Sequence, residues 1–139
     1  GKQKTSEMIQ TLECVEHEDF FQSELRIQFP FNLHMAAIQY ENKVASNAEE
    51  VRILAIHGWL DNAATYATLV PILMKKFFTD FRLKVKIVCI DMMGCGKSDH
   101  RAGSSYFHNE MVMDMLYAAQ ALQWRFVFLF VFVLLKKNM

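Results

Sequence analysis

Cysteine is scarce in this sequence, and the few cysteines follow no ligand or disulfide pattern. There are three, Cys14, Cys89 and Cys95, and no Cys-x-x-Cys pair occurs. An odd number without that spacing argues against a zinc ribbon, a thioredoxin-like site and a disulfide-stapled secreted domain. The histidines also lack paired-ligand spacing such as His-x-x-x-His, so we expect no metal and no other cofactor. The default expectation is a soluble protein in a reducing, intracellular compartment, which the sequence does not specify further.

An excess of charge of either sign is also missing. Fifteen lysines and arginines balance fifteen aspartates and glutamates, so the formal net charge is +0. Because nucleic-acid binding draws on a basic face, this balance argues against a nucleic-acid partner. No N-terminal apolar segment resembles a signal peptide. The longest apolar run, residues 126–135, is about half the roughly 20 residues that a membrane-spanning helix needs, which disfavours a membrane partner.

What the sequence does contain is apolar mass. Hydrophobic residues make up 53% of the chain and 12 of them are Phe, a composition typical of globular domains. A length of 139 residues is enough for one domain at most. We divide the chain into a flexible polar lead-in over residues 1–22, a folded domain over residues 24–129 and an apolar tail over residues 130–139.

Hydrophobic periodicity predicts strands that alternate with helices. Apolar and polar residues alternate over residues 24–29 and, less strictly, 33–40, which predicts two strands that could pair as a hairpin. Helical spacing predicts helices over residues 63–78 and 109–123, the first interrupted at Pro71. This alternation predicts an α/β fold with right-handed crossovers and a parallel sheet. Three short apolar segments resemble strands buried on both faces of such a sheet: residues 51–56, 85–90 and 126–135.

The connection after the first buried segment carries the motif His57-Gly58-Trp59-Leu60. A glycine directly after a strand lets the backbone turn sharply and approach a ligand. Backbone N–H groups in such a turn can point at a developing oxyanion, so we interpret these residues as a candidate oxyanion or pocket loop. For His57, a structural hydrogen bond at the strand end is favoured over catalysis, because no acidic partner or nucleophile stands nearby in the sequence.

The connection after the second buried segment carries Asp91-x-x-Gly94-x-Gly96-x-Ser98-Asp99. Its Gly-Lys-Ser portion could close a phosphate-binding G-x-x-x-x-G-K-[ST] pattern. The opening glycine of that pattern is replaced by Asp91, whose carboxylate would repel phosphate. The third glycine of the dinucleotide-binding fingerprint is missing as well. We therefore predict a structural loop here and no nucleotide site.

Taken together, the two motifs resemble the amino-terminal half of the α/β-hydrolase superfamily, and within it the serine hydrolase-like proteins. The resemblance implies an antiparallel hairpin followed by parallel strands with crossover helices over residues 24–129. It implies that the backbone N–H of Trp59, with Leu60 as the neighbouring candidate, is one oxyanion donor. It also implies that residues 91–99 line the pocket floor and brace the neighbouring strand ends. Two further segments add to the likeness: Ser98-Asp99-His100 and Tyr106-Phe107-His108.

The resemblance stops before the family's catalytic centre. The nucleophile of that family stands in a G-x-S-x-G elbow, and no such pattern occurs in these 139 residues. Residues 130–135 are apolar where the elbow is expected, and the acid and histidine would lie beyond Met139. We therefore expect a truncated fragment with no catalytic residue of its own, inactive as this chain. Full-length relatives would hydrolyse an ester, amide or thioester of a small-molecule substrate.

Two other functions compete with this interpretation. An apolar strand over residues 126–135 would have an open edge that could accept a partner strand or pair with a second copy. The chain would then be a non-catalytic interaction module. The same segment, followed by Lys136 and Lys137, could instead make a short form that associates with membranes. The sequence leaves open whether it is a real short form or an incomplete record.

Overall fold

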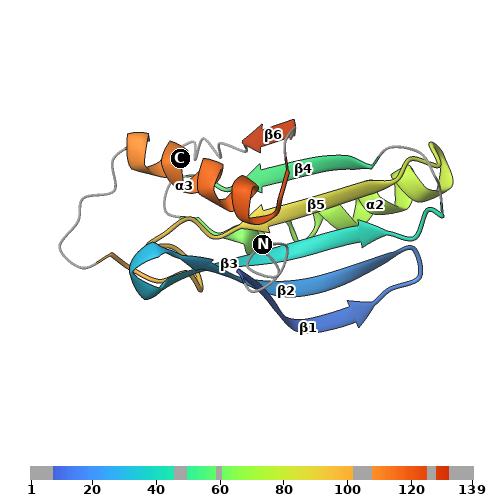
Figure 1. The fold of residues 1–139 in the computed structure, drawn as a ribbon. Helices are drawn as coiled ribbons and strands as arrows, with labels where there is room; N and C mark the ends of the chain where they lie inside the picture. Colours follow the sequence, from blue (N-terminus) through green and yellow to red (C-terminus); the bar gives the residue numbers. More distant parts are fainter. Residues whose placement is uncertain (1–7, 46–49, 59–60, 102–107, 125–127, 132–139) are drawn as a thin grey trace, which may run out of the picture.

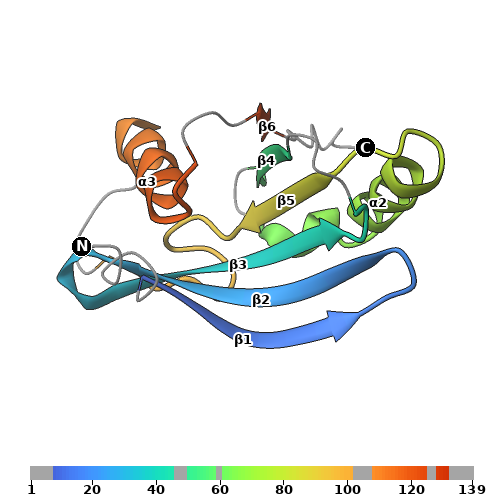
Figure 2. The same ribbon diagram turned by 45° about the vertical axis from the view of Figure 1, so that its right-hand side comes forward.

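The computed structural model describes residues 8–45, 50–58, 61–101, 108–124 and 128–131. These residues form one six-stranded sheet with helices packed against it (Figures 1 and 2). The strands in chain order are β1 Ile9–Glu16, β2 Phe20–Phe29, β3 Leu33–Asn42, β4 Val51–Ile56, β5 Val85–Ile90 and β6 Phe128–Val131. The helical elements are the short 3-10 helices η1 Pro30–Asn32 and η2 Ala63–Tyr66, and the α-helices α2 Leu69–Thr79 and α3 His108–Ala121.

The sheet is mixed, with an antiparallel half and a parallel half. Its order is β1-β2-β3-β5-β4-β6. Antiparallel pairs join β1 to β2, β2 to β3 and β3 to β5, whereas β4 runs parallel to both β5 and β6. The predicted hairpin and the predicted parallel strands are therefore both confirmed. The prediction of an α/β fold with these two parts is confirmed with them.

The predicted lead-in over residues 1–22 needs a correction, because most of its described part is strand. β1 pairs with β2 from Ile9 opposite Ile27 to Glu16 opposite Phe21, and β2 already begins at Phe20. The side chains of β1 after Ile9 are exposed, so this edge strand has no apolar alternation to detect. Its backbone hydrogen bonds to β2 need no apolar face. Residues 1–7 lie outside the described part of the chain.

The third predicted apolar strand is described over four residues. β6 lies parallel to β4, with Ile53 opposite Phe128 and Ile56 opposite Val131. Residues 126–127 and 132–135 of the predicted run lie outside the described residues. Of the predicted tail over residues 130–139, the first two residues belong to β6 and the rest lies outside the described residues. β6 stands last in the described sheet order. Self-association through residues 126–135 stays a prediction.

The helix predicted over residues 63–78 is in fact two elements. η2 ends at Tyr66, and α2 begins at Leu69. The side chain of Asn62 caps η2 by accepting a hydrogen bond from the N–H of Ala64, at 2.9 Å. Pro71 lies in the first turn of α2, where a missing N–H breaks no helical hydrogen bond, so it does not interrupt the helix. The helix predicted over residues 109–123 is confirmed by α3.

Two hydrophobic cores lie on opposite faces of the sheet. Val88 and Ile90 of β5 pack in the core that contains α3, while Ile87 and Cys89 pack in the core that contains α2. Since side chains alternate between the two faces of a strand, α2 and α3 cover opposite faces. Figure 2 shows the two helices apart on either side of the sheet. The sheet thus separates two layers of helix, as in other α/β folds.

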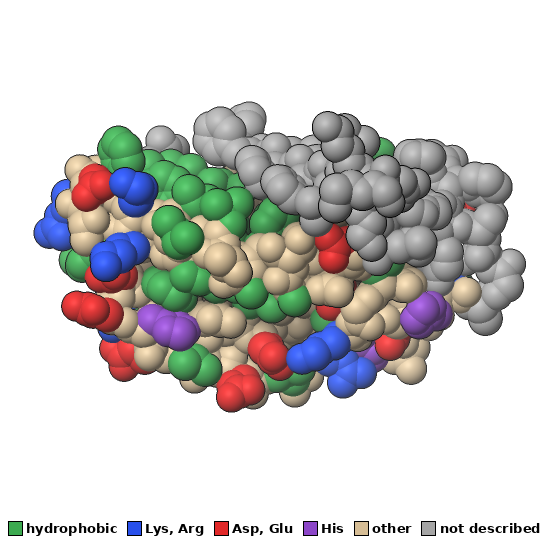
Figure 3. Space-filling view, turned by 180° about the vertical axis from the view of Figure 1, so that it is seen from behind, with side chains coloured by type: hydrophobic (Ala, Val, Ile, Leu, Met, Phe, Trp, Pro, Cys, Tyr) green, Lys and Arg blue, Asp and Glu red, His purple; other side chains and the backbone are tan. Residues whose placement is uncertain are grey.

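α2 also leaves apolar side chains exposed on its outer side. Val70 and Met74 are buried against the sheet, whereas Leu69 and Ile72 are exposed. Hydrophobic side chains are visible at the surface in the view from behind, with charged side chains mainly around them (Figure 3). The helix is therefore apolar on more of its circumference than the sheet covers.

Buried titratable groups in the α2 core predict a loss of stability at alkaline pH. Burial, with a smaller contribution from the charge of Asp91, raises the pKa of the Cys89 thiol from 9.0 to about 12. Burial, with a smaller contribution from the charge of Cys89, raises the pKa of Tyr40 from 10.0 to about 12. Between the ordinary and the raised pKa of each group, the unfolded chain binds fewer protons than the folded chain. Stability should therefore be complete below pH 9.0 and fall above it, by about 1.4 kcal/mol per pH unit per group.

Urea denaturation at a series of pH values checks this expectation. Cys89→Val should flatten the decline above pH 9.0 and leave the contribution of Tyr40, which begins at its own ordinary pKa of 10.0. A wild-type midpoint that does not change across this range would contradict the prediction. So would an equally steep decline in Cys89→Val.

Candidate active site

Two loops leave the same end of the sheet. The first loop, residues 57–62, follows Ile56 at the end of β4, and the second loop, residues 91–99, follows Ile90 at the end of β5. Ile56 and Ile90 stand opposite one another in the parallel pair of strands, so the two loops start side by side. Ligands of open α/β sheets bind outside the carboxyl ends of the strands, which is where these loops lie.

His57 ties the start of the first loop to the second. Its Nε2 accepts a hydrogen bond from the N–H of Met92 at 2.9 Å, and its Nδ1 lies 2.8 Å from the carbonyl oxygen of Gly58. Because one nitrogen accepts while the other donates, these contacts fit the tautomer with its proton on Nδ1. The imidazole is 4% exposed. Both ring nitrogens are thus engaged within the loops, as a structural role for His57 requires.

Asp91 ties the end of the first loop to the second. Its Oδ1 accepts a hydrogen bond from the N–H of Ala63 at 2.6 Å, and its Oδ2 accepts one from the N–H of Lys97 at 2.9 Å. Ala63 is the first residue after the first loop, so that loop is anchored at both ends to consecutive residues, Asp91 and Met92. Trp59 and Leu60 lie outside the described residues, so their predicted role as oxyanion donors stays a prediction.

The second loop extends the sheet beyond the end of β5. The N–H of Asp91 donates to the carbonyl oxygen of Ala36 at 2.9 Å, and the N–H of Ala36 donates to Ser98 Oγ at 2.8 Å. The N–H of Asp99 donates to the carbonyl oxygen of His34 at 2.9 Å, and the N–H of His34 donates to Asp99 Oδ2 at 2.8 Å. Ser98 Oγ also donates to the carbonyl oxygen of Asp91 at 2.6 Å. On the side of β3 that faces β5, the side chains of Ser98 and Asp99 and the backbone N–H groups of Asp91 and Asp99 therefore bind the first part of the strand.

The two glycines of the second loop both have positive φ angles. Gly94 has φ 84° and lies in a turn closed by the hydrogen bond from the N–H of Cys95 to the carbonyl oxygen of Met92, at 2.9 Å. Gly96 has φ 51°, and a Cβ placed on it would lie 2.4 Å from Oδ2 of Asp91. Both positions therefore suit glycine, the second also because the Asp91 carboxylate occupies the space of a side chain.

A small cavity of about 150 Å³ lies between the two loops and α3. His57 and Gly58 line it from the first loop, and residues 92–95 line it from the second. The guanidinium of Arg101 binds the carboxylate of Asp114 through two hydrogen bonds, one of them 2.9 Å between Nη1 and Oδ2. Among the described residues, Arg101, Glu110, Met111 and Asp114 also line it. Apart from these polar groups, the cavity is mostly apolar.

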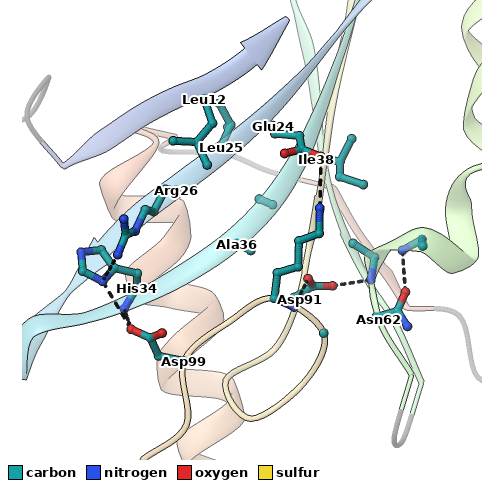
Figure 4. Close-up of a pocket in the computed structure, with 15 residues that line it drawn as sticks. Leu12, Glu24, Leu25, Arg26, His34, Ala36, Ile38, Asn62, Asp91 and Asp99 are labelled. Atoms are coloured by element: carbon teal, nitrogen blue, oxygen red, sulfur yellow. Dashed lines mark hydrogen bonds and ion pairs between the residues drawn. The ribbon is translucent and has the colours of Figure 1, made fainter. Parts of the chain in front are cut away.

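A larger cavity of about 500 Å³ lies between β2, β3, η2 and the second loop (Figure 4). Except for Asp91, its charged side chains are engaged with one another. Lys97 Nζ lies 3.2 Å from Glu24 Oε1, and His34 Nδ1 lies 3.1 Å from Arg26 Nη2 and 3.3 Å from Asp99 Oδ2. Among the described residues of the first loop, those at its start border only the smaller cavity. We therefore place the candidate chemistry at the smaller cavity, despite the size of the larger one.

The predicted residues of the second loop divide between the two cavities. Asp91, Gly96 and Asp99 line the larger cavity, Gly94 lines the smaller one, and Ser98 braces β3. Sequence reasoning missed the pair of Arg101 and Asp114 at the smaller cavity. The two residues are separated by a connection whose path no local pattern reveals.

Neither a metal cluster nor a spanning helix is found in the part of the chain that the structure covers. No group of three or more His, Cys, Asp or Glu side chains among the described residues could hold a metal ion. No described helix combines the length and the apolar character needed to cross a bilayer.

No family model matches this sequence, but several curated proteins do. A serine hydrolase-like protein of Dictyostelium discoideum is 32% identical over 103 residues, which cover 73% of this chain and 26% of that protein. The human serine hydrolase-like protein is 32% identical over 103 residues and is covered to 44%. The zebrafish protein of the same name is 38% identical over 74 residues and is covered to 20%.

Solved structures show the same relationship at the level of the fold. A hypothetical protein from Pseudomonas aeruginosa PAO1 is 30% identical, with a TM-score of 0.61 over 84% of this chain and 35% of that one. The juvenile hormone epoxide hydrolase of the silkworm Bombyx mori is 17% identical, with a TM-score of 0.68 over 82% of this chain and 29% of that one. The thioesterase domain from the curacin biosynthetic pathway is 17% identical, with a TM-score of 0.60.

The chain spans less than half the length of each of these proteins. The sheet with its two flanking helices matches the fold of the solved structures, and the curated relatives are all serine hydrolase-like proteins. The chain therefore forms part of an α/β-hydrolase fold and is similar in sequence to the serine hydrolase-like proteins.

Proposed function

We propose that this chain provides the oxyanion side of a serine-hydrolase site for an ester, amide or thioester of a small molecule. The observation that carries the proposal is the double anchoring of the first loop, through His57 to Met92 and through Ala63 to Asp91. An oxyanion donor works only when it is already aimed at the position of the developing charge. The anchoring of both ends of the loop supports such an arrangement, and the proposed donor is the backbone N–H of Trp59.

We further propose that these 139 residues do not hydrolyse a substrate by themselves. The chain has no G-x-S-x-G pattern, which would place an activated serine on a strained turn. Ser98 is the serine that stands in a glycine-rich motif, and it is 4% exposed. Its Oγ is engaged with the N–H of Ala36 and the carbonyl oxygen of Asp91. Ser98 is therefore a poor nucleophile, and the serine of a complete site would come from residues that follow this part of the fold.

A fluorophosphonate probe, which reacts with activated serines, tests both halves of this proposal. We expect no labelling of the 139-residue chain. A chimaera in which this chain replaces the matched segment of the Dictyostelium relative should be labelled, as the unmodified relative should be. In the chimaera, Trp59→Pro removes the proposed donor N–H and should slow labelling about 100-fold. Trp59→Phe, the matched control, keeps that N–H and should label at the original rate.

Two results would count against the proposal. Stoichiometric labelling of the 139-residue chain would mean that it carries an activated serine of its own. A folded chimaera that stays unlabelled beside a labelled parent would mean that the first loop does not serve the site. Thermal unfolding of each variant separates a folding defect from a loss of reactivity.

A further inference from the structure

We propose that the smaller cavity binds the acyl chain of the substrate, and that this chain is short and uncharged, with about six carbons at most. This inference rests on the proposed function, because it assumes that the carbonyl of the substrate binds at the first loop. It adds the substrate class, which neither the relatives nor the motifs specify.

The position of the cavity links it to the proposed oxyanion donor. Gly58 lines the cavity, and it directly precedes Trp59 in the sequence. If the N–H of Trp59 binds the carbonyl oxygen of the substrate, the attached acyl chain begins only one or two bonds from that oxygen. Of the two cavities, only the smaller one is bordered by Gly58. The larger cavity is lined by residues from the end of the first loop and by the paired charges of β2 and β3.

The walls of the cavity suit a flexible hydrocarbon chain. Met92 and Met93 are 2% and 4% exposed and line it from the second loop, and Met111 lines it from α3. Methionine side chains are flexible and polarisable, so they adapt to an apolar chain that has several conformations. Each methylene that enters such a site should tighten binding about fourfold.

The volume of the cavity limits the length of the chain. A cavity of about 150 Å³ lined by aliphatic side chains holds a ligand of about the size of benzene, which has six carbons. Affinity should therefore increase with chain length up to about six carbons and then stop increasing. A longer chain would have to displace the methionines or leave the cavity.

The polar groups of the walls disfavour a chain that carries a charge. Arg101 and Asp114 neutralise one another through their two hydrogen bonds. Burial, followed by the charges of Asp91 and Asp61, raises the pKa of Cys95, which keeps this thiol in its neutral form. Glu110 also lines the cavity, and its carboxylate disfavours an acyl chain that ends in an anion. The expected substrate is thus an ester, amide or thioester of a monocarboxylic acid.

Binding can be measured on the 139-residue chain without any catalysis. The chain is labelled with ¹³C in its methionine methyl groups and titrated with linear aliphatic amides, which are uncharged mimics of an acyl group. We expect saturable shifts of the Met92, Met93 and Met111 methyl signals, while Met8 and Met74 stay unchanged. The Kd should fall about fourfold per added carbon up to about six carbons and then level off.

Variants of α3 test whether the signals report on this cavity. Met111→Trp should fill the cavity and weaken hexanamide binding by about tenfold or more. Met113→Trp is the matched control on the same helix, because Met113 is 64% exposed, and it should bind hexanamide as the wild type does. Met111→Ala should enlarge the cavity and move the preferred chain length upward, which provides a second test if Met111→Trp does not fold.

The inference is overturned if the amides cause no saturable shift, if the Kd does not depend on chain length, or if Met111→Trp and Met113→Trp bind alike. A labelled chimaera together with absent amide binding would overturn this inference and leave the proposed function intact. Chain-length-dependent binding in the cavity, beside an unlabelled folded chimaera, would support the cavity as a chain-binding site and overturn the proposed function.

Discussion

Gly96→Ala is expected to lower the free energy of unfolding by about 2–5 kcal/mol. The backbone at Gly96 has φ 51°, where an alanine is strained by about 1–2 kcal/mol. Its Cβ would also lie 2.4 Å from Oδ2 of Asp91, so the carboxylate would have to move. The N–H groups of Ala63 and Lys97 would then lose their acceptor, and for the buried N–H of Ala63 this costs about 1–3 kcal/mol. Small domains are stable by only about 5–15 kcal/mol, so this single methyl group removes a large share.

A double-mutant cycle with Asp91→Ala separates the collision from the backbone strain. Asp91→Ala alone should be strongly destabilising, because it leaves the same two N–H groups without an acceptor. Gly96→Ala added to that variant should cost only the strain of about 1–2 kcal/mol. Urea denaturation of the four proteins gives the coupling between the two sites. Additive effects would show that the carboxylate and the new methyl group do not compete for the same space.

Arg101→Met is expected to lower the free energy of unfolding by about 3 kcal/mol. The guanidinium of Arg101 satisfies both carboxylate oxygens of Asp114, whose side chain is 8% exposed. Removing the arginine leaves a buried carboxylate without this counter-charge, which is far more costly than the pair itself is stabilising. The loss should appear as a lower midpoint of urea unfolding, accompanied by weaker packing of α3 beside the smaller cavity.

The double variant Arg101→Met/Asp114→Leu distinguishes the cost of an unpaired charge from a need for the ion pair. Two apolar side chains of similar size should restore most of the stability, because desolvation of both charges is then avoided. A single variant that unfolds at the wild-type urea concentration would contradict a desolvated pair. A double variant less stable than Arg101→Met would show that the pair itself holds α3 in place.

Most strands of the fold are predictable from hydrophobic pattern alone, and the exceptions have a physical explanation. β4 and β5 are buried on both faces, so their sequences are almost wholly apolar. β1 is an exposed edge strand, and its pairing with β2 rests on backbone groups that every residue carries. The break between η2 and α2 was missed because apolar residues continue at helical spacing across it.

The candidate site is predictable as two motifs but not as one arrangement. The glycines of the second loop and the histidine and glycine of the first stand directly after strands, which any reading of the chain can find. Asp91 serves the end of the first loop as well as its own loop. It does so because its Oδ1 lies 2.6 Å from the backbone nitrogen of Ala63, which is 28 residues away in the sequence. The bond between Arg101 and Asp114 depends in the same way on where α3 packs.

The sequence by itself determined the alternation of strands and helices, the burial of β4 and β5, the two glycine-containing loops and the absence of a G-x-S-x-G pattern. These features depend on residue type and on spacing along the chain, which local physical chemistry interprets directly. Only the tertiary structure decided that one carboxylate and one imidazole anchor the first loop, that Ser98 and Asp99 bind the first part of β3, and that three methionines line a small cavity. Such contacts join residues far apart in the chain, and their geometry exists only after the sheet has brought its strand ends together.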